Sequence, residues 1–280
     1  MTQALYGWRP GEQTSPTQPF PTKPPPFARQ GFTTDDLIDF TPELRAEALK
    51  IVADYTLGPL FTPPTVVGEN GKKGVLQVPS AAGGANWGGA GFDPETGYLF
   101  LQSANIVSLA AVVKNDDPQK SAYTIRGAAG PPGPRGLPLI KPPYGRITAI
   151  DMNRGEIVWQ VPNGVGPRDH PAIRHLKLGR LGSPGRPSPL ATRTLLFIGE
   201  GSDFVGGGRS AGMPAEITTN YGAPWFRAYD KATGEVVWEL ELPAGVTGAP
   251  ITYMFEGKQY LVVAISGRKH PGEFVAFSLP

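Results

Sequence analysis

Apolar and polar residues alternate on both sides of a short polar turn near residue 230. Aromatic residues precede the turn in WFRAY, and beyond it EVVWELEL places apolar residues at Val236, Trp238, Leu240 and Leu242. Such period-two alternation is typical of half-buried strands. Asp230 can accept backbone N–H bonds in the turn, and Gly234 can adopt the positive φ that closes it. The pattern predicts a β-hairpin, which needs further strands to be stable.

The same eleven-residue pattern occurs elsewhere in the chain. AIDMNRGEIVW, residues 149–159, matches AYDKATGEVVW, residues 228–238, in its Ala, Asp, Gly, Glu, Val and Trp. GFDPETGYLFL, residues 91–101, keeps the Asp, Thr and Gly but ends in Leu. A D-x-x-T-G turn is common in hairpins, but two copies that end in Trp favour a repeated unit. The spacing of Asp93, Asp151 and Asp230 suits blades of four short strands, so we expect an all-β fold of the β-propeller type.

Two segments near the N-terminus depart from the strand pattern. Residues 1–32 are rich in proline, as in TSPTQPFPTKPPPF, and predict an extended arm. Residues 33–58 predict a short helical insertion, in which Thr41 caps the helix PELRAEALKIVADY. Strands and glycine loops over residues 59–280 predict about four propeller blades. Within them, residues 114–145 are rich in Pro, Gly and charge and predict a long loop.

Composition narrows the classes of function. The chain has 280 residues and a net charge of +2, from 26 basic and 24 acidic residues, and it lacks a basic stripe. Nucleic acid is therefore not an expected partner. There is no Cys, which excludes disulfides and thiolate chemistry. Because no apolar stretch matches a signal peptide or a membrane span, neither a signal peptide nor a transmembrane helix is predicted in this chain.

The loop SAAGGANWGGAGFDPETG, residues 80–97, is the candidate for binding chemistry. Glycines on both sides of Asn86 and Trp87 allow a backbone or a flat ligand to approach closely. The Asn amide can donate to a carbonyl, and the Trp offers a rigid apolar face. A turn Asn and a packing Trp explain the same pattern, and the residues alone favour this simpler explanation. No metal site is predicted, because metal-ligand spacing is absent around the three loop histidines His170, His175 and His270.

The repeated motif resembles the tryptophan-docking motif A-x-D-x-x-T-G-x-x-x-W of pyrroloquinoline quinone (PQQ)-dependent dehydrogenases. Three further segments are similar, in the same order, to the membrane-bound glucose, quinate and polyol dehydrogenase branch of these quinoproteins: TSPTQPFPTKPPPF with LFTPP, GGANWGGAGFDPETG, and PAGVTGAPITYMFEGKQYLVVAISG. The resemblance implies an eight-bladed propeller, of which this chain would form about four blades. It also implies that Trp159 and Trp238 stack on the motif of a neighbouring blade and are structural.

The resemblance implies a chemistry as well. The family oxidises an aldose, polyol or cyclic alcohol by hydride transfer to PQQ, with an Asp as base and Ca²⁺ or Mg²⁺ as Lewis acid. The electrons pass to a respiratory quinone. Asn86 matches the Asn of the family's N-W-G segment at the cofactor, and Trp87 lies beside it. Catalytic residues and metal ligands are expected outside this chain, because they precede the TSPTQPF segment in the family.

A whole propeller of the family needs roughly twice this length. We therefore expect the C-terminal portion of the enzyme, inactive by itself and completed by an N-terminal half when the gene is split. The full-length protein would lie in the periplasm or on the periplasmic face of the inner membrane. The alternative is a non-enzymatic propeller scaffold that keeps the docking motifs and binds protein partners.

Overall fold

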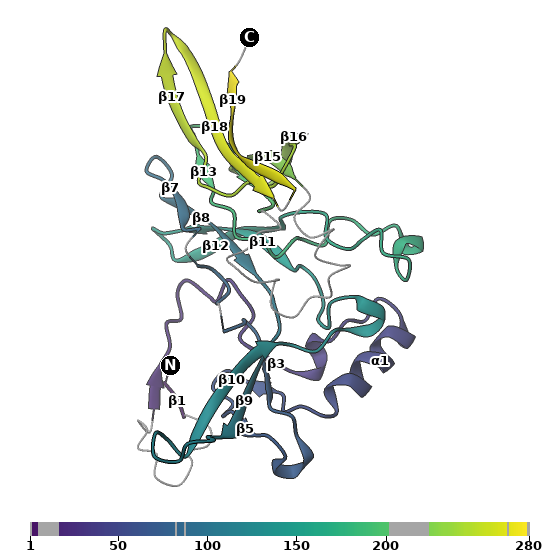
Figure 1. Cartoon of the computed structure of the whole chain (residues 1–280). Coiled ribbons are helices and arrows are strands. Elements are labelled where there is room, and N and C mark those ends of the chain that lie inside the picture. The colour runs from purple at the N-terminus through teal and green to yellow at the C-terminus, as the bar shows by residue number, and fades with distance from the viewer. Residues whose placement is uncertain are drawn as a thin grey trace. The chain divides into compact units, whose positions relative to one another are not determined.

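The computed structural model describes residues 2–4, 17–81, 83–86, 88–201, 224–267 and 269–278 (Figure 1). The described chain divides into two compact units. Unit 1 holds the described residues up to Gly84 together with Asn105–Lys141, and unit 2 holds Ala85–Ala104 and the described residues 142–201 and 224–278. Apart from one α-helix and short 3₁₀ turns, the regular elements of these residues are strands, which confirms the all-β fold class.

The helix of unit 1 forms where its capping residues predict it. α1 (Pro42–Val52) begins after Thr41, whose Oγ1 accepts the Leu44 N–H at 3.3 Å, and proline occupies the first turn, where it costs no hydrogen bond. The helix buries Leu44, Ala48 and Val52 on one face. The apolar stripe thus fixes which side of the helix faces the core of unit 1.

Unit 1 also contains a mixed sheet centred on β9. The sheet contains β5 (Thr65–Val66), β6 (Val75–Gln77), β9 (Ser108–Lys114) and β10 (Tyr123–Ala129). Two further pairs form separate two-stranded sheets: β1 (Thr2–Ala4) with β2 (Thr17–Pro19), and β3 (Gly31–Phe32) with β4 (Gly58–Pro59). β10 pairs antiparallel with β9, while β5 pairs parallel and β6 antiparallel with it. The expected loop over residues 114–145 is therefore wrong in part, because β10 contains no proline and pairs with β9 along its whole length. The predicted division at residues 32 and 58 stays a prediction.

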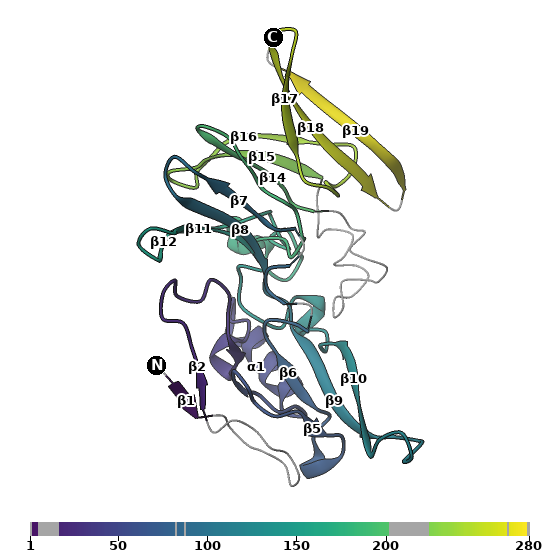
Figure 2. The same cartoon turned by 90° about the vertical axis from the view of Figure 1, so that its left-hand side faces the viewer.

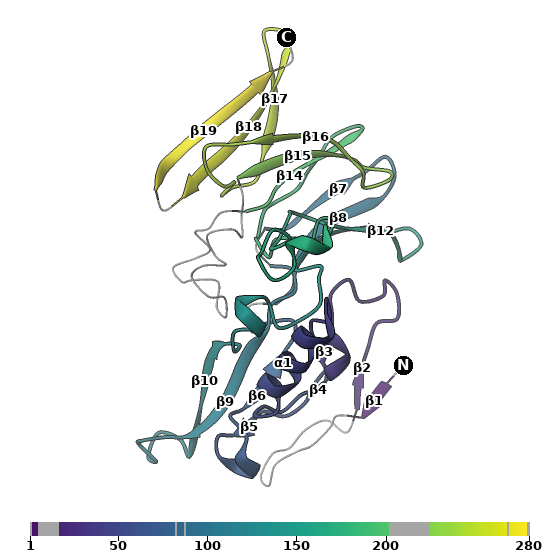
Figure 3. The same cartoon turned by 90° about the vertical axis from the view of Figure 1, so that its right-hand side faces the viewer.

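Unit 2 consists of three successive antiparallel sheets, which Figures 2 and 3 show one after another. Sheet 1 contains β7 (Ala90–Asp93), β8 (Tyr98–Ala104), β11 (Gly145–Asp151) and β12 (Glu156–Pro162). Sheet 2 contains β13 (Leu190–Ala191), β14 (Leu195–Gly199), β15 (Trp225–Asp230) and β16 (Val236–Glu241). Sheet 3 contains β17 (Ile251–Phe255), β18 (Lys258–Gly267) and β19 (His270–Ser278). In each sheet the strands lie in the order of the chain, which is the pattern of propeller blades.

Both faces of sheet 2 are covered by apolar cores. One core joins sheets 1 and 2 through buried Phe100 and Ile147 on one side and Leu196 and Ile198 on the other. A second core joins sheets 2 and 3 around Phe226, with buried residues Leu242, Ala244, Val246, Val263 and Ile265. Burial of each large side chain contributes about 1.5–3 kcal/mol, so these two interfaces dominate the stability of unit 2.

Each repeated Asp begins a turn between antiparallel strands, as predicted. The Asp230 carboxylate accepts the N–H groups of Ala232 at 2.8 Å and Thr233 at 3.0 Å, and Gly234 closes the turn with φ +77°. Asp93 and Asp151 make the same kind of turn. However, these two turns belong to one sheet, β7–β8 and β11–β12, so the three Asp residues do not mark three separate blades.

Trp159 joins sheet 1 to the repeated turn of sheet 2. Its indole N–H donates to the Lys231 carbonyl at 3.1 Å, and a side chain built on Gly234 would come within 2.8 Å of its ring. Trp238, at the equivalent position of sheet 2, makes edge contacts with Phe226 and with Phe277 of sheet 3 and remains 40% exposed. Both Trp residues pack between neighbouring sheets, as predicted. Trp159 also stacks on the repeated motif of the next sheet, whereas the described contact of Trp238 with sheet 3 is to the Phe277 ring.

A buried ion pair reinforces the same contact between sheets 1 and 2. Lys231 Nζ lies 2.6 Å from Asp93 Oδ2 and also donates to the Thr192 carbonyl at 3.2 Å. Burial alone would raise the pKa of the Asp93 carboxyl, but hydrogen bonds from Lys231, Thr96 and the Glu95 N–H outweigh it and hold this pKa below its usual value. The carboxyl therefore stays ionised well into the acid range.

Trp159→Ala should lower the free energy of unfolding by about 2–4 kcal/mol, because it removes a large packed side chain together with its hydrogen bond. Trp238→Ala is the matched control, and it should cost less because that ring is 40% exposed. Urea unfolding of the two variants measures the difference. Equal losses would show that contact with the repeated turn adds nothing to stability.

Asp93→Asn should lower the free energy of unfolding by about 3 kcal/mol at neutral pH, because it leaves the Lys231 ammonium buried without its carboxylate. The contribution of Asp93 is present above the unfolded-state pKa of about 3.9 and is lost as pH falls through the lower folded-state pKa. Urea unfolding across the acid range should therefore show a weaker pH dependence in the variant.

Asp54→Asn, which breaks an exposed ion pair with Lys73, is the control and should change stability little. An acid dependence in Asp93→Asn as steep as that of the wild type would contradict the role of the buried pair.

Candidate functional site

Asn86 lies in a tight turn immediately before β7. The Gly89 N–H donates to the Asn86 carbonyl at 3.0 Å, and Gly89 has a φ of +67°, which favours glycine at this position. The Asn86 side chain is half-buried. Trp87, the other predicted site residue, lies outside the described residues. We call the described residues Asn86, Gly88 and Gly89 the Asn86 turn.

The Asn86 turn has one packed side and one open side. A side chain built on Gly88 would lie 3.0 Å from the Pro187 carbonyl oxygen and 3.2 Å from that of Arg186, so this backbone packs closely against the turn. A side chain built on Gly89 would meet none of the described residues within 4 Å, and we call this the open side of the turn. The packed side fixes the turn against residues that precede β13.

A buried ion pair lies in sheet 2, beside the segment that packs on the Asn86 turn. Arg227 Nη1 is 2.6 Å from Glu200 Oε1, and the two side chains are 1% and 0% exposed. Ser183 Oγ donates to the second oxygen of Glu200 at 2.7 Å. Burial disfavours the charge of the guanidinium, but Glu200 and Glu239 outweigh it and hold the pKa of Arg227 above its usual value. This arginine therefore stays charged.

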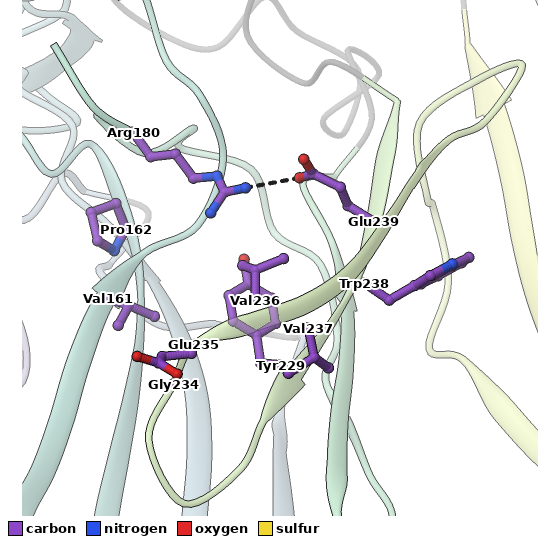
Figure 4. Close-up of a pocket in the computed structure, with 10 residues that line it drawn as sticks. All are labelled: Val161, Pro162, Arg180, Tyr229, Gly234, Glu235, Val236, Val237, Trp238 and Glu239. Atoms are coloured by element: carbon purple, nitrogen blue, oxygen red, sulfur yellow. Dashed lines mark hydrogen bonds and ion pairs between the residues drawn. The ribbon is translucent and has the colours of Figure 1, made fainter.

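Glu239 is the second partner of Arg227 and lies at the edge of a surface pocket. Arg227 Nε donates to Glu239 Oε2 at 2.8 Å, and Arg180 reaches the same oxygen at 2.9 Å. Figure 4 shows the Arg180 guanidinium and the Glu239 carboxylate in direct contact. Both side chains line a surface pocket of about 580 Å³, together with Val161 and Val236. Burial would raise the pKa of Glu239, but Arg227 and Arg180 lower it below its usual value.

A chain of uncharged polar groups continues from the ion pair towards sheet 1. Tyr229 Oη donates to Asn163 Oδ1 at 3.0 Å, and Asn163 Nδ2 donates to Gln102 Oε1 at 3.3 Å and to the Gly199 carbonyl at 2.8 Å. Burial raises the pKa of Tyr229 to about 12, so its phenol stays neutral and acts as a donor. These bonds satisfy polar groups that would otherwise be costly to bury.

The sequence patterns do not identify this network. One signal was present, because Arg227 is a charge within an otherwise apolar and aromatic strand, and a buried Arg requires an acidic partner. The partner Glu200 follows a different strand, β14, so no local pattern connects the two. Among the described residues, no cluster of three or more His, Cys, Asp or Glu side chains could hold a metal ion, and no helix is long and apolar enough to span a membrane.

The sequence match to known proteins decides the family. Residues 6–261 match the PQQ family described as the glucose/ethanol/alcohol dehydrogenase β-propeller domain. The chain belongs to this family. The three sheets of unit 2, which pack face to face through apolar cores, are blades of a partial PQQ-dehydrogenase propeller. The stacking of Trp159 on the turn of the next sheet is the docking contact between two of these blades.

Three relatives illustrate the enzymes within the PQQ family that this chain resembles. It is 27% identical to quinate/shikimate dehydrogenase (quinone) of Acinetobacter baylyi, over 96% of this chain and 34% of the relative. It is 28% identical to quinoprotein glucose dehydrogenase of Gluconobacter oxydans, over 100% and 36%. It is 29% identical to the large subunit of glycerol dehydrogenase of the same organism, over 97% and 38%. The chain thus spans somewhat more than a third of the length of these relatives.

Gly185→Ala should lower the free energy of unfolding by about 1–3 kcal/mol, because its methyl group would overlap the Glu200 carbonyl oxygen and force the backbone apart. Gly179→Ala is the matched control, since a side chain at this exposed position meets nothing within 4 Å. Thermal unfolding of both variants measures the effect. A stable Gly185→Ala protein would mean that the segment before β13 is not held tightly against Glu200.

Proposed function

We propose that the protein of which these residues are part is a PQQ-dependent dehydrogenase that oxidises a hydroxyl group of an aldose, a polyol or a cyclic alcohol. The family match over residues 6–261 is the observation that carries the proposal. The relatives suggest the substrate class, since their names identify them as dehydrogenases of quinate or shikimate, glucose and glycerol.

The Asn86 turn fits a flat cofactor rich in carbonyl and carboxylate oxygens. The Asn86 amide can donate a hydrogen bond to such an oxygen, and the open side of Gly89 gives a planar ring system room to lie against the turn. Bound PQQ supplies the redox chemistry, because its quinone accepts a hydride from the substrate carbon. Asn86 would orient the ring system, and Trp87 is proposed to contact it. The base and the ligands of a Ca²⁺ or Mg²⁺ ion are proposed to lie outside this chain.

Electron transfer to a respiratory quinone and a location at the periplasmic face of the inner membrane complete the proposal. The name of the Acinetobacter relative, which specifies a quinone, supports this acceptor. A further polypeptide segment, the N-terminal half, is proposed to complete the propeller beside sheet 3. One face of sheet 3 supports this partner, because it exposes large apolar side chains at Ile251 (56%), Tyr253 (45%), Phe255 (57%) and Phe274 (80%).

Asn86→Ala should weaken PQQ binding by about 1–3 kcal/mol, or roughly 5- to 150-fold, because a buried polar partner on the cofactor loses its donor. Quenching of protein fluorescence on titration with PQQ measures the dissociation constant. Asn153→Ala, in the exposed Asp151 turn, is the matched control and should leave PQQ binding unchanged. An unaltered dissociation constant in Asn86→Ala would remove this residue from the cofactor site.

The activity itself is tested by dye-linked oxidation of quinate, glucose and glycerol with PQQ and Ca²⁺ or Mg²⁺. We expect PQQ- and metal-dependent turnover of about 1–1000 per second with at least one of these substrates once the N-terminal half is supplied. The 280-residue chain alone should show none, because the proposed base and metal ligands lie elsewhere. Comparable turnover by this chain alone would contradict that placement, and failure of the completed protein to bind PQQ would favour a scaffold.

A further inference from the structure

The segment that packs on the Asn86 turn is held at two points by carboxylates of sheet 2. The Arg180 guanidinium lies 2.9 Å from Glu239 Oε2, and Figure 4 shows this contact as a dashed line. At Ser183 the hydroxyl donates to Glu200 Oε2 at 2.7 Å. We call residues 180–187 the clamped segment. It has no helix or strand of its own, although the N–H groups of Leu181, Gly182 and Ser183 donate to backbone carbonyls of residues 163–165. The two side-chain contacts add a restraint from the acids beside β15.

One buried arginine holds both carboxylates. Arg227 directs Nη1 to Glu200 at 2.6 Å and Nε to Glu239 at 2.8 Å. Both acids therefore contact the same buried guanidinium, Glu200 through an ion pair and Glu239 through a hydrogen bond, and this shared partner restrains their positions relative to each other. Residues 180 and 183 are therefore both connected to Arg227, the first through Glu239 and the second through Glu200. We call these five side chains the circuit: Arg180, Glu239, Arg227, Glu200 and Ser183.

The clamped segment transmits this geometry to the Asn86 turn through backbone contact. Its Gly185 lies directly against the Glu200 carbonyl, with no space for a side chain. The next two residues, Arg186 and Pro187, present their carbonyl oxygens to Gly88 at distances that a methyl group could barely fit. A shift of Ser183 or Gly185 would therefore displace the Arg186 and Pro187 carbonyls, against which the Asn86 turn packs.

A buried ion pair is a poor source of stability, since its desolvation cost can exceed the attraction, and apolar replacements are often no worse. The circuit instead fixes the position of the backbone of the clamped segment. We propose that Arg227, Glu200 and Ser183 are positioning residues that set the geometry of the Asn86 turn and thereby its affinity for PQQ. The effect on PQQ rests on the function proposed above, whereas the effect on the turn does not.

The test uses Ser183→Ala and Glu200→Gln, with Ser188→Ala as the matched control for the serine change. The first readout is hydrogen exchange of the Gly89 amide, which bonds to the Asn86 carbonyl at 3.0 Å. This exchange should accelerate about five- to tenfold in Ser183→Ala and Glu200→Gln, the effect of one lost buried hydrogen bond, and stay unchanged in Ser188→Ala. Amides of the β14–β15 ladder should keep the exchange rates of the wild type.

The second readout is the PQQ dissociation constant of the protein completed by its N-terminal half. It should rise about five- to tenfold in Ser183→Ala, and Ser183→Ala combined with Asn86→Ala should bind no more weakly than Asn86→Ala alone. Unchanged Gly89 exchange in Ser183→Ala, or equal acceleration throughout sheet 2, would overturn the positioning role. A wild-type protein that binds no PQQ would instead refute the proposed function, and the exchange result would still decide the role of the circuit.

Discussion

The stacking of an indole ring on a glycine turn is the contact on which the arrangement of unit 2 depends. Strands within a sheet are held by their ladder hydrogen bonds, whereas the contacts between sheets 1 and 2 are made largely by side chains. Trp159 contacts both Gly234 and the Lys231 carbonyl, so it fixes the distance and the register between sheets 1 and 2. The apolar cores can then form on both faces of sheet 2 without sliding.

Local chemistry made much of this fold predictable from the sequence. The Asp230 turn and the N-cap at Thr41 depend on neighbouring residues, and each occurs where it was predicted. The assignment of each Asp turn to its own blade was wrong, because the sequence of a hairpin does not record which strands pair on its outer edges. The sequence analysis also missed β10. Its pairing with β9 stabilises the strand despite the low strand propensity of its glycine and the charge of its arginine.

The sequence predicts Asn86 and Trp87 for the candidate site, and that assignment stays a prediction. The glycines around Asn86 indicate a close approach, but they do not reveal that the carbonyls of Arg186 and Pro187 provide the packed wall. Glu200 and Arg227 come from separate strands, and their contact depends on the stagger of β14 against β15. Such contacts between distant residues follow from the assembled sheet and from no spacing in the chain.

The ion pair of Lys231 and Asp93 has a consequence for the repeats themselves. Lys231 occupies a variable position of the repeated motif. In the copy at residues 149–159 this position is Met152, a half-exposed residue. A lysine is favourable at position 231 because Asp93 of the neighbouring sheet pairs with its ammonium group. The copies at residues 149–159 and 228–238 are therefore not interchangeable. Exchanging them would leave the Asp93 carboxylate without its lysine, or place a lysine ammonium where no carboxylate faces it. Substitutions at 93 and 231 in related sequences should accordingly occur together.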